Sequence, residues 1–192
     1  PRPINISTFY NYKTFSSFIE SKYVPKTDIY FGISRSEILP LFNYNYVVDG
    51  NSYTNFNLTT SQFSIQWNPF SGYMQTPTGR LEIEKKFPKF AFQVTKSFDN
   101  ILGSDFDFTK IDLKITHEIP YLNGQNTSFI LQSGMAFGDT PLTHLYSIAP
   151  NNLNRETLFK RITIAGKNSF ETMFFNEFFS SEFAFLQLKH GF

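Results

Sequence analysis

The chain has 192 residues and a net charge of +1, with 17 Lys and Arg against 16 Asp and Glu, and it contains no cysteine. This balance leaves no basic stripe for nucleic acid, and the missing cysteine excludes disulfides, thiolate metal sites and cysteine nucleophiles. Aromatic residues make up 19% of the chain, among them 25 Phe and 10 Tyr. No segment reaches the roughly 18 consecutive apolar residues of a membrane-spanning helix, so helical membrane proteins are excluded.

The first third of the chain shows the two-residue periodicity of β-strands. Residues 15–26 look irregular, Pro40 is expected to interrupt the sheet, and Asp49-Gly50-Asn51 predicts a tight turn. The strands predicted in this part are 4–12, 28–35, 41–48 and 53–59.

Apolar and polar residues continue to alternate along the rest of the chain. Phe63, Ile65 and Trp67 share one face of a predicted strand, opposite Ser64 and Gln66. A further strand begins near Gly79, with Leu81 and Ile83 on one face. Ile111, Leu113 and Ile115 form the clearest apolar side of any predicted strand. The other strands predicted are 90–97, 129–137 and 182–190.

These patterns predict an all-β fold of about eight to ten strands, many of them about nine to eleven residues long. That is the length of a tilted strand that crosses a bilayer, whereas strands of globular proteins average nearer five or six residues. We therefore expect an antiparallel transmembrane β-barrel. Alternation alone also fits a soluble or surface-exposed β-sandwich, which would bind carbohydrate or protein through exposed rings such as Trp67, Tyr73 and Tyr121.

In a barrel, the charged sides of two strands are expected to face the lumen. The long connection over residues 138–168 is expected to be functional or disordered, and to lie outside the sheet or fold into the lumen. The lumen-face candidates are Arg80, Glu82, Glu84, Lys110, Asp112 and Lys114. The loop candidates are Asp139, His144, Asn151, Asn152 and Arg155.

The chemistry of these residues does not favour an enzyme. His144 has Thr143 and Ser147 nearby, which would suit a barrel hydrolase, but a local hydrogen bond is the more common role of such a histidine. Glu82 and Glu84 share a face and are within reach of Arg80, and they are more typical of a solvated face than of acid–base catalysis. Asp99, Asp105 and Asp107 resemble a weak calcium loop, yet their spacing favours a polar turn. We expect no catalytic residue, no metal and no cofactor.

Two segments carry a family resemblance. The run Gly134-Met135-Ala136-Phe137-Gly138-Asp139-Thr140-Pro141-Leu142, followed by His144-Leu145-Tyr146, resembles the late barrel region of surface-antigen-type proteins, the superfamily of outer-membrane assembly factors. The run Phe170-Glu171-Thr172-Met173-Phe174-Phe175-Asn176-Glu177-Phe178-Phe179-Ser180 is similar to an uncharacterised Gram-negative outer-membrane family with an N-terminal carboxypeptidase-regulatory-like domain.

The resemblance extends over residues 36–190 and implies that residues 1–192 are part of a larger barrel of about sixteen strands. It implies the outer membrane of a Gram-negative bacterium, a role in envelope protein assembly, export or transport, and contact with lipid and other envelope proteins. The superfamily's Arg-Gly-aromatic loop motif is absent, because Arg155 is followed by Glu156. An insertase mechanism is therefore not carried over.

Overall fold

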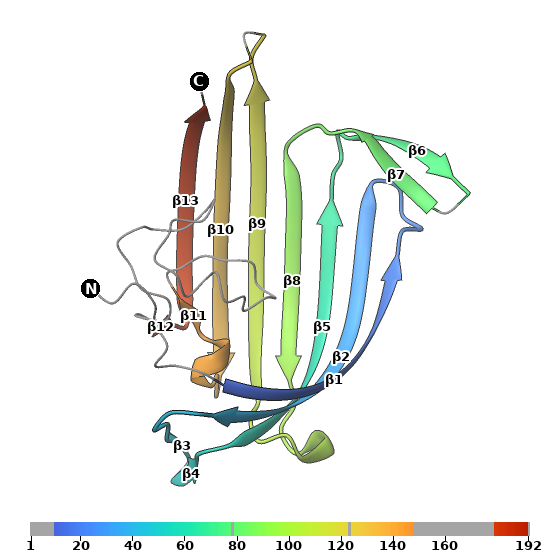
Figure 1. Ribbon diagram of the computed structural model, residues 1–192. Coiled ribbons are helices and arrows are strands. Elements are labelled where there is room, and N and C mark those ends of the chain that lie inside the picture. Colours follow the sequence, from blue (N-terminus) through green and yellow to red (C-terminus); the bar gives the residue numbers. More distant parts are fainter. Residues whose placement is uncertain (1–9, 78, 123, 148–178, 192) are drawn as a thin grey trace.

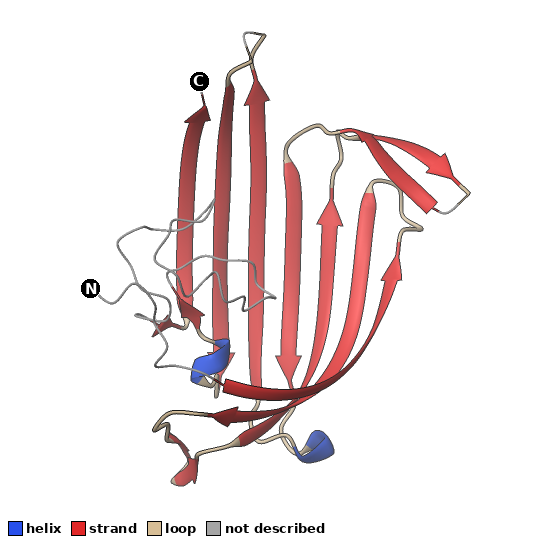
Figure 2. Cartoon of the chain, in the orientation of Figure 1, coloured by secondary structure: helices blue, strands red, loops and turns tan. Residues whose placement is uncertain are grey.

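A computed structural model describes residues 10–77, 79–122, 124–147 and 179–191. Seven long strands form one antiparallel sheet, and three two-stranded pairs accompany it (Figures 1 and 2). The long strands are β1 (Tyr10–Ser21), β2 (Thr27–Pro40), β5 (Phe56–Trp67), β8 (Lys89–Ser97), β9 (Phe108–Pro120), β10 (Asn126–Gly138) and β13 (Glu182–Gly191). The short strands are β3 (Tyr46–Val48), β4 (Asn51–Tyr53), β6 (Gly72–Thr76), β7 (Gly79–Glu84), β11 (Tyr146–Ser147) and β12 (Phe179–Ser180).

The long strands run up and down in chain order, β1-β2-β5-β8-β9-β10-β13. The β3–β4 hairpin and the 3₁₀ turn η1 (Ile101–Gly103) lie at one end of the sheet, and the β6–β7 hairpin lies at the other (Figure 1). A second 3₁₀ turn, η2 (Leu142–His144), follows β10. No helix among the described residues is long and apolar enough to cross a membrane.

The sheet curls into an open trough rather than a closed cylinder. β1 and β13 are its two edges, and among the described strands they pair only with β2 and β10, respectively. The predicted antiparallel all-β fold is therefore confirmed, whereas the described strands do not close into the expected barrel. The long strands span 9 to 14 residues, and five of the seven are longer than the nine to eleven residues predicted.

Four sequence predictions were wrong in detail. The strand predicted at 53–59 and the one through Phe63, Ile65 and Trp67 form a single strand, β5, while Tyr53 ends the short β4. Residues 15–21, predicted to be irregular, belong to β1. The prediction failed because the two consecutive polar residues Ser16 and Ser17 interrupt the alternation of apolar and polar residues. Residues 41–45 are not a strand, and only the short β3 follows. The strand at residues 79–84 lies in the β6–β7 hairpin and not in the seven-stranded sheet. Residues 4–9 lie outside the described residues.

The buried core sits at the β3–β4 end of the trough. Ile38, Phe56, Leu58 and Phe108 point from three strands toward Phe106, which lies in the loop before β9. Phe106 makes edge contacts with Tyr46, Tyr53 and Phe56, at ring-centroid distances of 4.8 to 5.4 Å. This aromatic cluster fixes the loops at that end, since edge-to-face ring pairs add specific geometry to apolar burial.

Candidate functional site

The convex face of the sheet is apolar across all seven strands. The strand registers bring every second residue to this face, and most of its apolar side chains are exposed although they are large. Phe15 is 80% exposed and Leu186 is 71% exposed. We call this set the apolar belt: Phe15, Ile19, Ile29, Phe31, Ile33, Phe63, Ile65, Trp67, Phe90, Phe92, Val94, Ile111, Leu113, Ile115, Ile119, Phe129, Leu131, Met135, Phe137, Leu186 and Leu188.

The belt runs at a slant to the strands. On β1 its middle lies at Ser17, between Phe15 and Ile19, and on β13 it lies between Leu186 and Leu188. It is widest on β9 and β10, where it spans nine residues of each strand. The strand registers lead from Ser17 on β1 to the level of residue 180 beside β13, whereas the middle of the belt on β13 lies at residue 187. The middle therefore shifts by about seven residues over six steps from strand to strand. With a rise of about 3.4 Å per residue and a strand spacing of about 4.8 Å, the slant is about 40°.

The concave face is polar along the middle of the trough. Its side chains bond to one another across strands: Ser34 and Thr60 lie 2.8 Å apart at their hydroxyl oxygens, and Gln62 Nε2 donates to Gln93 Oε1 at 3.1 Å. These groups line a hollow of about 710 Å³. We call the uncharged ones the inner polar face: Ser16, Ser34, Thr60, Gln62, Ser64, Gln66 and Gln93. Asp112 and Lys114 line the same hollow from β9.

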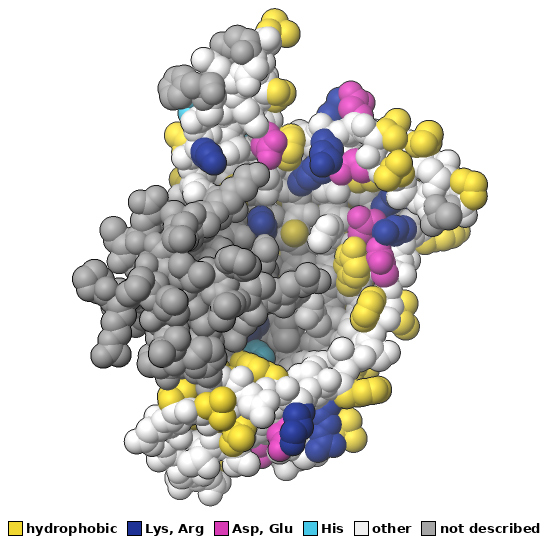
Figure 3. All heavy atoms as spheres, viewed as in Figure 1, with side chains coloured by type: hydrophobic (Ala, Val, Ile, Leu, Met, Phe, Trp, Pro, Cys, Tyr) yellow, Lys and Arg dark blue, Asp and Glu magenta, His cyan; other side chains and the backbone are white. Residues whose placement is uncertain are grey.

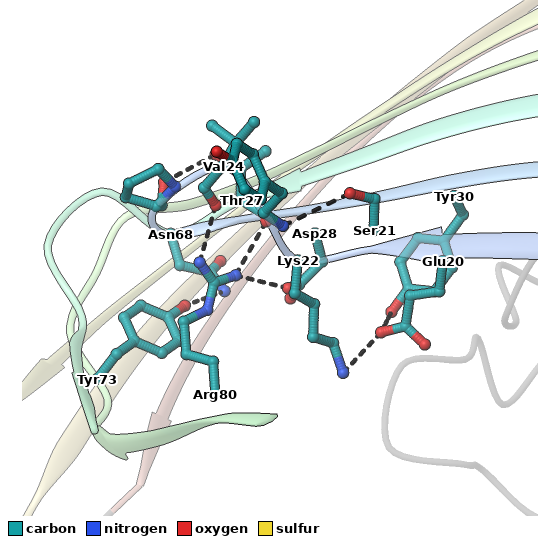
Figure 4. A network of polar contacts seen from close by, with 12 residues as sticks. Glu20, Ser21, Lys22, Val24, Thr27, Asp28, Tyr30, Asn68, Tyr73 and Arg80 are labelled. Atoms are coloured by element: carbon teal, nitrogen blue, oxygen red, sulfur yellow. Dashed lines mark hydrogen bonds and ion pairs between the residues drawn. The ribbon is translucent and has the colours of Figure 1, made fainter. Parts of the chain in front are cut away.

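Arg80 is the best-fixed of the predicted lumen residues. Its guanidinium donates to the carbonyls of Val24 and Thr27 at 2.8 and 2.9 Å, and it pairs with Asp28 at 2.7 Å (Figure 4). The same group lies over the Tyr73 ring, 4.7 Å from its centroid. Arg80 therefore fastens the β6–β7 hairpin to the β1–β2 turn, and its ion-pair partner is Asp28, not the expected Glu82 or Glu84.

The two glutamates of β7 have different surroundings. Glu82 accepts a hydrogen bond from Lys89 Nζ at 2.6 Å, and both side chains are mostly buried. Glu84 pairs with Lys86 at 3.0 Å in an exposed position. A second hollow of about 370 Å³ lies between the hairpin and the sheet, where Glu82, Arg80 and Lys114 line it. Of the β7 acids, only Glu82 belongs to this charged end of the concave face.

Lys110, Asp112 and Lys114 project from β9 to the concave face, opposite Ile111, Leu113 and Ile115. Asp112 is 4% exposed, and neither of its carboxylate oxygens has a hydrogen-bond partner among the residues that the structure describes. Lys110 Nζ lies 4.2 Å from the centroid of the Tyr146 ring. The strand therefore places two lysines and one buried carboxylate on the polar side.

Tyr146 rests on a gap left by Gly134. A Cβ built on Gly134 would come within 2.6 Å of the Tyr146 ring and of the Phe183 ring. The Tyr146 and Phe183 rings are in contact, with centroids 4.6 Å apart. Only glycine leaves room for this close approach, so Gly134 allows the segment after β10 to lie against the concave face.

Two of the five loop candidates fall within the described residues. His144 Nδ1 lies 3.0 Å from the Thr143 hydroxyl, and its ring packs on Phe108 with centroids 5.2 Å apart. Burial, together with the nearby Lys110 charge, lowers the pKa of His144 to about 3. Asp139 is held by its backbone N–H, which donates to the Asp107 carbonyl at 2.9 Å. Asn151, Asn152 and Arg155 lie outside the described residues.

The remaining sequence candidates do not gather into a site. Trp67 stacks on Phe90 in the apolar belt, Tyr73 lies beneath Arg80, and the Tyr121 hydroxyl lies 3.3 Å from Thr127 Oγ1. Among the acids considered for calcium, Asp105 accepts a hydrogen bond from the Asn57 N–H at 2.7 Å, and Asp107 pairs with Lys96. Within the described ranges, no group of three His, Cys, Asp or Glu side chains is arranged to hold a metal ion.

Sequence reasoning missed three residues that matter on the concave face. Gly134 and Tyr146 stand in the segment that carries the family resemblance, but nothing in the sequence indicated that they touch, since one is a glycine inside a strand and the other an aromatic residue in a loop. Phe18 lies on the concave side of β1 and is 73% exposed, although its neighbours on that face are polar. Because residues 15–26 were predicted to be irregular, the sequence did not assign Phe18 to either face of a strand.

The fold and its two faces define an antiparallel all-β protein with an exposed apolar exterior and a polar concave side. A family model described as "Family of unknown function (DUF5686) C-terminal domain" matches residues 40–145, more than half of the chain. The chain belongs to this family. Searches of curated proteins and of solved structures gave no match.

Proposed function

We propose that this chain is part of a transmembrane β-barrel in the outer membrane of a Gram-negative bacterium, where it serves envelope protein assembly, export or transport. The apolar belt carries the proposal. Large apolar side chains stay exposed on every long strand, while the opposite face is polar. Outer-membrane barrels have this arrangement, with a lipid-facing apolar band and a polar interior.

The slant of the belt supports the same proposal. Strands of such barrels cross the bilayer with a tilt of about 35–45°, so a level lipid band crosses successive strands at shifted positions. A slant of about 40° agrees with that tilt. A belt that only covered a flat apolar core would not need a net shift along the strands from one edge of the sheet to the other.

A β-sandwich explains the exposed belt less well. Sandwiches bury the apolar faces of two sheets against each other, with a core about 10 Å thick. Here the apolar face of the seven-stranded sheet is exposed, and Phe63, Phe92 and Leu131 are each at least 39% exposed. In a barrel, lipid would cover these side chains, and further strands would pair with the edges of β1 and β13.

The lengths of the connections suggest which end faces outward. In outer-membrane barrels, turns on the periplasmic side are short and loops on the outer side are longer. The connections at residues 41–55, 98–107 and 139–181 share one end and have 10 to 43 residues. At the other end, those at 22–26 and 121–125 have five residues each, and only the connection at 68–88, which holds the β6–β7 hairpin, is longer. We place the end with the β3–β4 hairpin on the cell surface.

A two-site labelling experiment tests both location and orientation. The chain has no cysteine, so two substitutions serve as selective reporters: Asn51→Cys at the exposed start of β4, next to the β3–β4 turn, and Leu122→Cys in the exposed β9–β10 turn. A membrane-impermeant maleimide should label Asn51→Cys in intact cells and Leu122→Cys only after the outer membrane is permeabilised. The opposite order would overturn the orientation.

A fractionation control completes the test of location. The intact protein should remain in the outer-membrane fraction, and boiled and unboiled samples in detergent should differ in gel mobility. A soluble protein without a mobility shift would overturn the barrel and favour a binding module.

A further inference from the structure

One exposed apolar side chain on the concave face fits neither a lipid-facing position nor a water-filled polar interior. Phe18 projects to the concave side of β1 and is 73% exposed. Its partner across the ladder is Gly32, whose missing side chain leaves the Phe18 ring open on that side. A large apolar ring exposed on a polar face is informative, since the hydrophobic effect opposes it unless something covers the ring.

The surroundings of Phe18 are aromatic and polar, and the charged residues that line the same hollow, Asp112 and Lys114, lie across the trough on β9. Following the registers, the row that begins at Phe18 continues through Gly32, Gln62 and Thr95. The adjacent row holds Tyr30, Ser64 and Gln93, and the Tyr30 hydroxyl donates to Glu20 at 3.3 Å. Two rings therefore lie beside a group of amides and hydroxyls.

The amides are held in order by their own hydrogen bonds. Gln62 Nε2 donates to Gln93 Oε1 at 3.1 Å, and Gln93 Nε2 donates to Thr95 Oγ1 at 3.3 Å. An amide has two donor hydrogens and an oxygen with two lone pairs, so each retains capacity toward the hollow. The ion pairs Arg80–Asp28 and Glu82–Lys89 lie at the end of the trough that carries the β6–β7 hairpin. Figure 3 shows basic and acidic side chains gathered there and also at the opposite end.

We propose that the hollow on the concave face is a binding site for a neutral oligosaccharide. The C–H face of a sugar ring can stack on Phe18, while its hydroxyls can donate to and accept from the amides of Gln62 and Gln93 and from the hydroxyls of Ser34 and Thr60. The hollow of about 710 Å³ lies within the range of small-molecule sites, which combine apolar walls with a few oriented polar groups. This site rests on the proposed function, because it places the ligand in the lumen of the barrel.

The test uses the intact protein in detergent and an array of immobilised neutral and charged oligosaccharides. The site predicts retention of neutral oligosaccharides, and the tightest of them is then titrated by calorimetry. Phe18→Ala should weaken binding about tenfold or more, since it removes the stacking ring, and Gln62→Leu should have an effect of similar size. Phe15→Ala is the matched control, because Phe15 is an exposed ring on the convex face of the same strand, and it should change affinity by less than about twofold.

Three results would overturn the site: retention of no neutral oligosaccharide, preference for peptides or charged ligands, or an equal loss with Phe15→Ala. Gel mobility of the same samples separates this site from the proposed function. A heat-dependent shift without sugar binding would remove the site and leave the barrel. Sugar binding that Phe18→Ala weakens, in a soluble protein without a shift, would keep the hollow as a binding site and remove the membrane.

Discussion

A charge placed in the middle of the apolar belt should destabilise the protein in lipid far more than the same charge at its border. On β9, the belt extends from Ile111 to Ile119, so Ile115 marks its middle. The four residues from Ile115 to Ile119 span about 14 Å of strand, which at a tilt of about 40° is about 10 Å of depth. Half of an apolar band about 25 Å tall is about 12 Å, so Ile119 lies near the interface.

The free-energy cost of each arginine depends on its depth in the bilayer. An arginine on the lipid face costs about 2–4 kcal/mol at the bilayer midplane and about 0–1 kcal/mol near the interface. Ile115→Arg should therefore lower the free energy of unfolding in lipid vesicles by about 2–4 kcal/mol, and Ile119→Arg by at most about 1 kcal/mol. Thr116→Arg, on the concave side of the same strand, serves as the inner-face control and should cost less than about 1 kcal/mol.

The assay follows the folded fraction against urea concentration by gel mobility of the intact protein in vesicles. The reasoning is refuted if Ile115→Arg and Thr116→Arg lower stability equally, because the two faces would then have the same surroundings. A larger cost for Ile119→Arg than for Ile115→Arg would refute the depth assigned to the belt.

Three further predictions concern the contacts on the concave face. Gly134→Ala should displace Tyr146, because the new Cβ would lie 2.6 Å from its ring, and limited proteolysis after β10 should become faster. Arg80→Gln should loosen the β6–β7 hairpin by about 2–3 kcal/mol, since it removes a mostly buried charged group that makes three hydrogen bonds, and hydrogen exchange in residues 72–84 should rise. The pKa of His144 is lowered to about 3 from 6.5, so the folded state binds fewer protons than the unfolded state between these values. Stability should thus fall as the pH drops below 6.5, and His144→Gln should flatten that dependence in urea titrations at pH 7 and pH 5.

The two faces of the long strands could be predicted from the sequence because side chains alternate with a period of two. In the structure, as predicted, one face of β9 carries Ile111, Leu113 and Ile115, and the other carries Lys110 and Asp112. The register of β9 with β8 and β10 extends the same division across the sheet. Alternation is a local property, so one strand is enough to reveal it.

Features that depend on distant partners could not be predicted. Leu81 and Ile83 alternate with polar residues as in the long strands, yet β7 has only six residues and pairs only within the β6–β7 hairpin. The ion pair between Arg80 and Asp28 joins residues that are far apart in the sequence, so no local pattern predicts it. The close approach of Tyr146 to Gly134 depends on a loop path that no periodicity describes. Closure of the sheet depends on whether the edges of β1 and β13 find partners, which alternation within either strand does not determine.

The most direct test of the lipid-facing belt is a spin-label scan along β5 in the intact, membrane-inserted protein. Single cysteines at residues 62–66 would carry the label, and their collision rates with oxygen and with a water-soluble nickel complex would be compared. Labels at Phe63 and Ile65 should collide mainly with oxygen, and labels at Gln62, Ser64 and Gln66 mainly with the nickel complex. The same preference at all five positions, without alternation, would contradict a sheet with lipid on one side and water on the other.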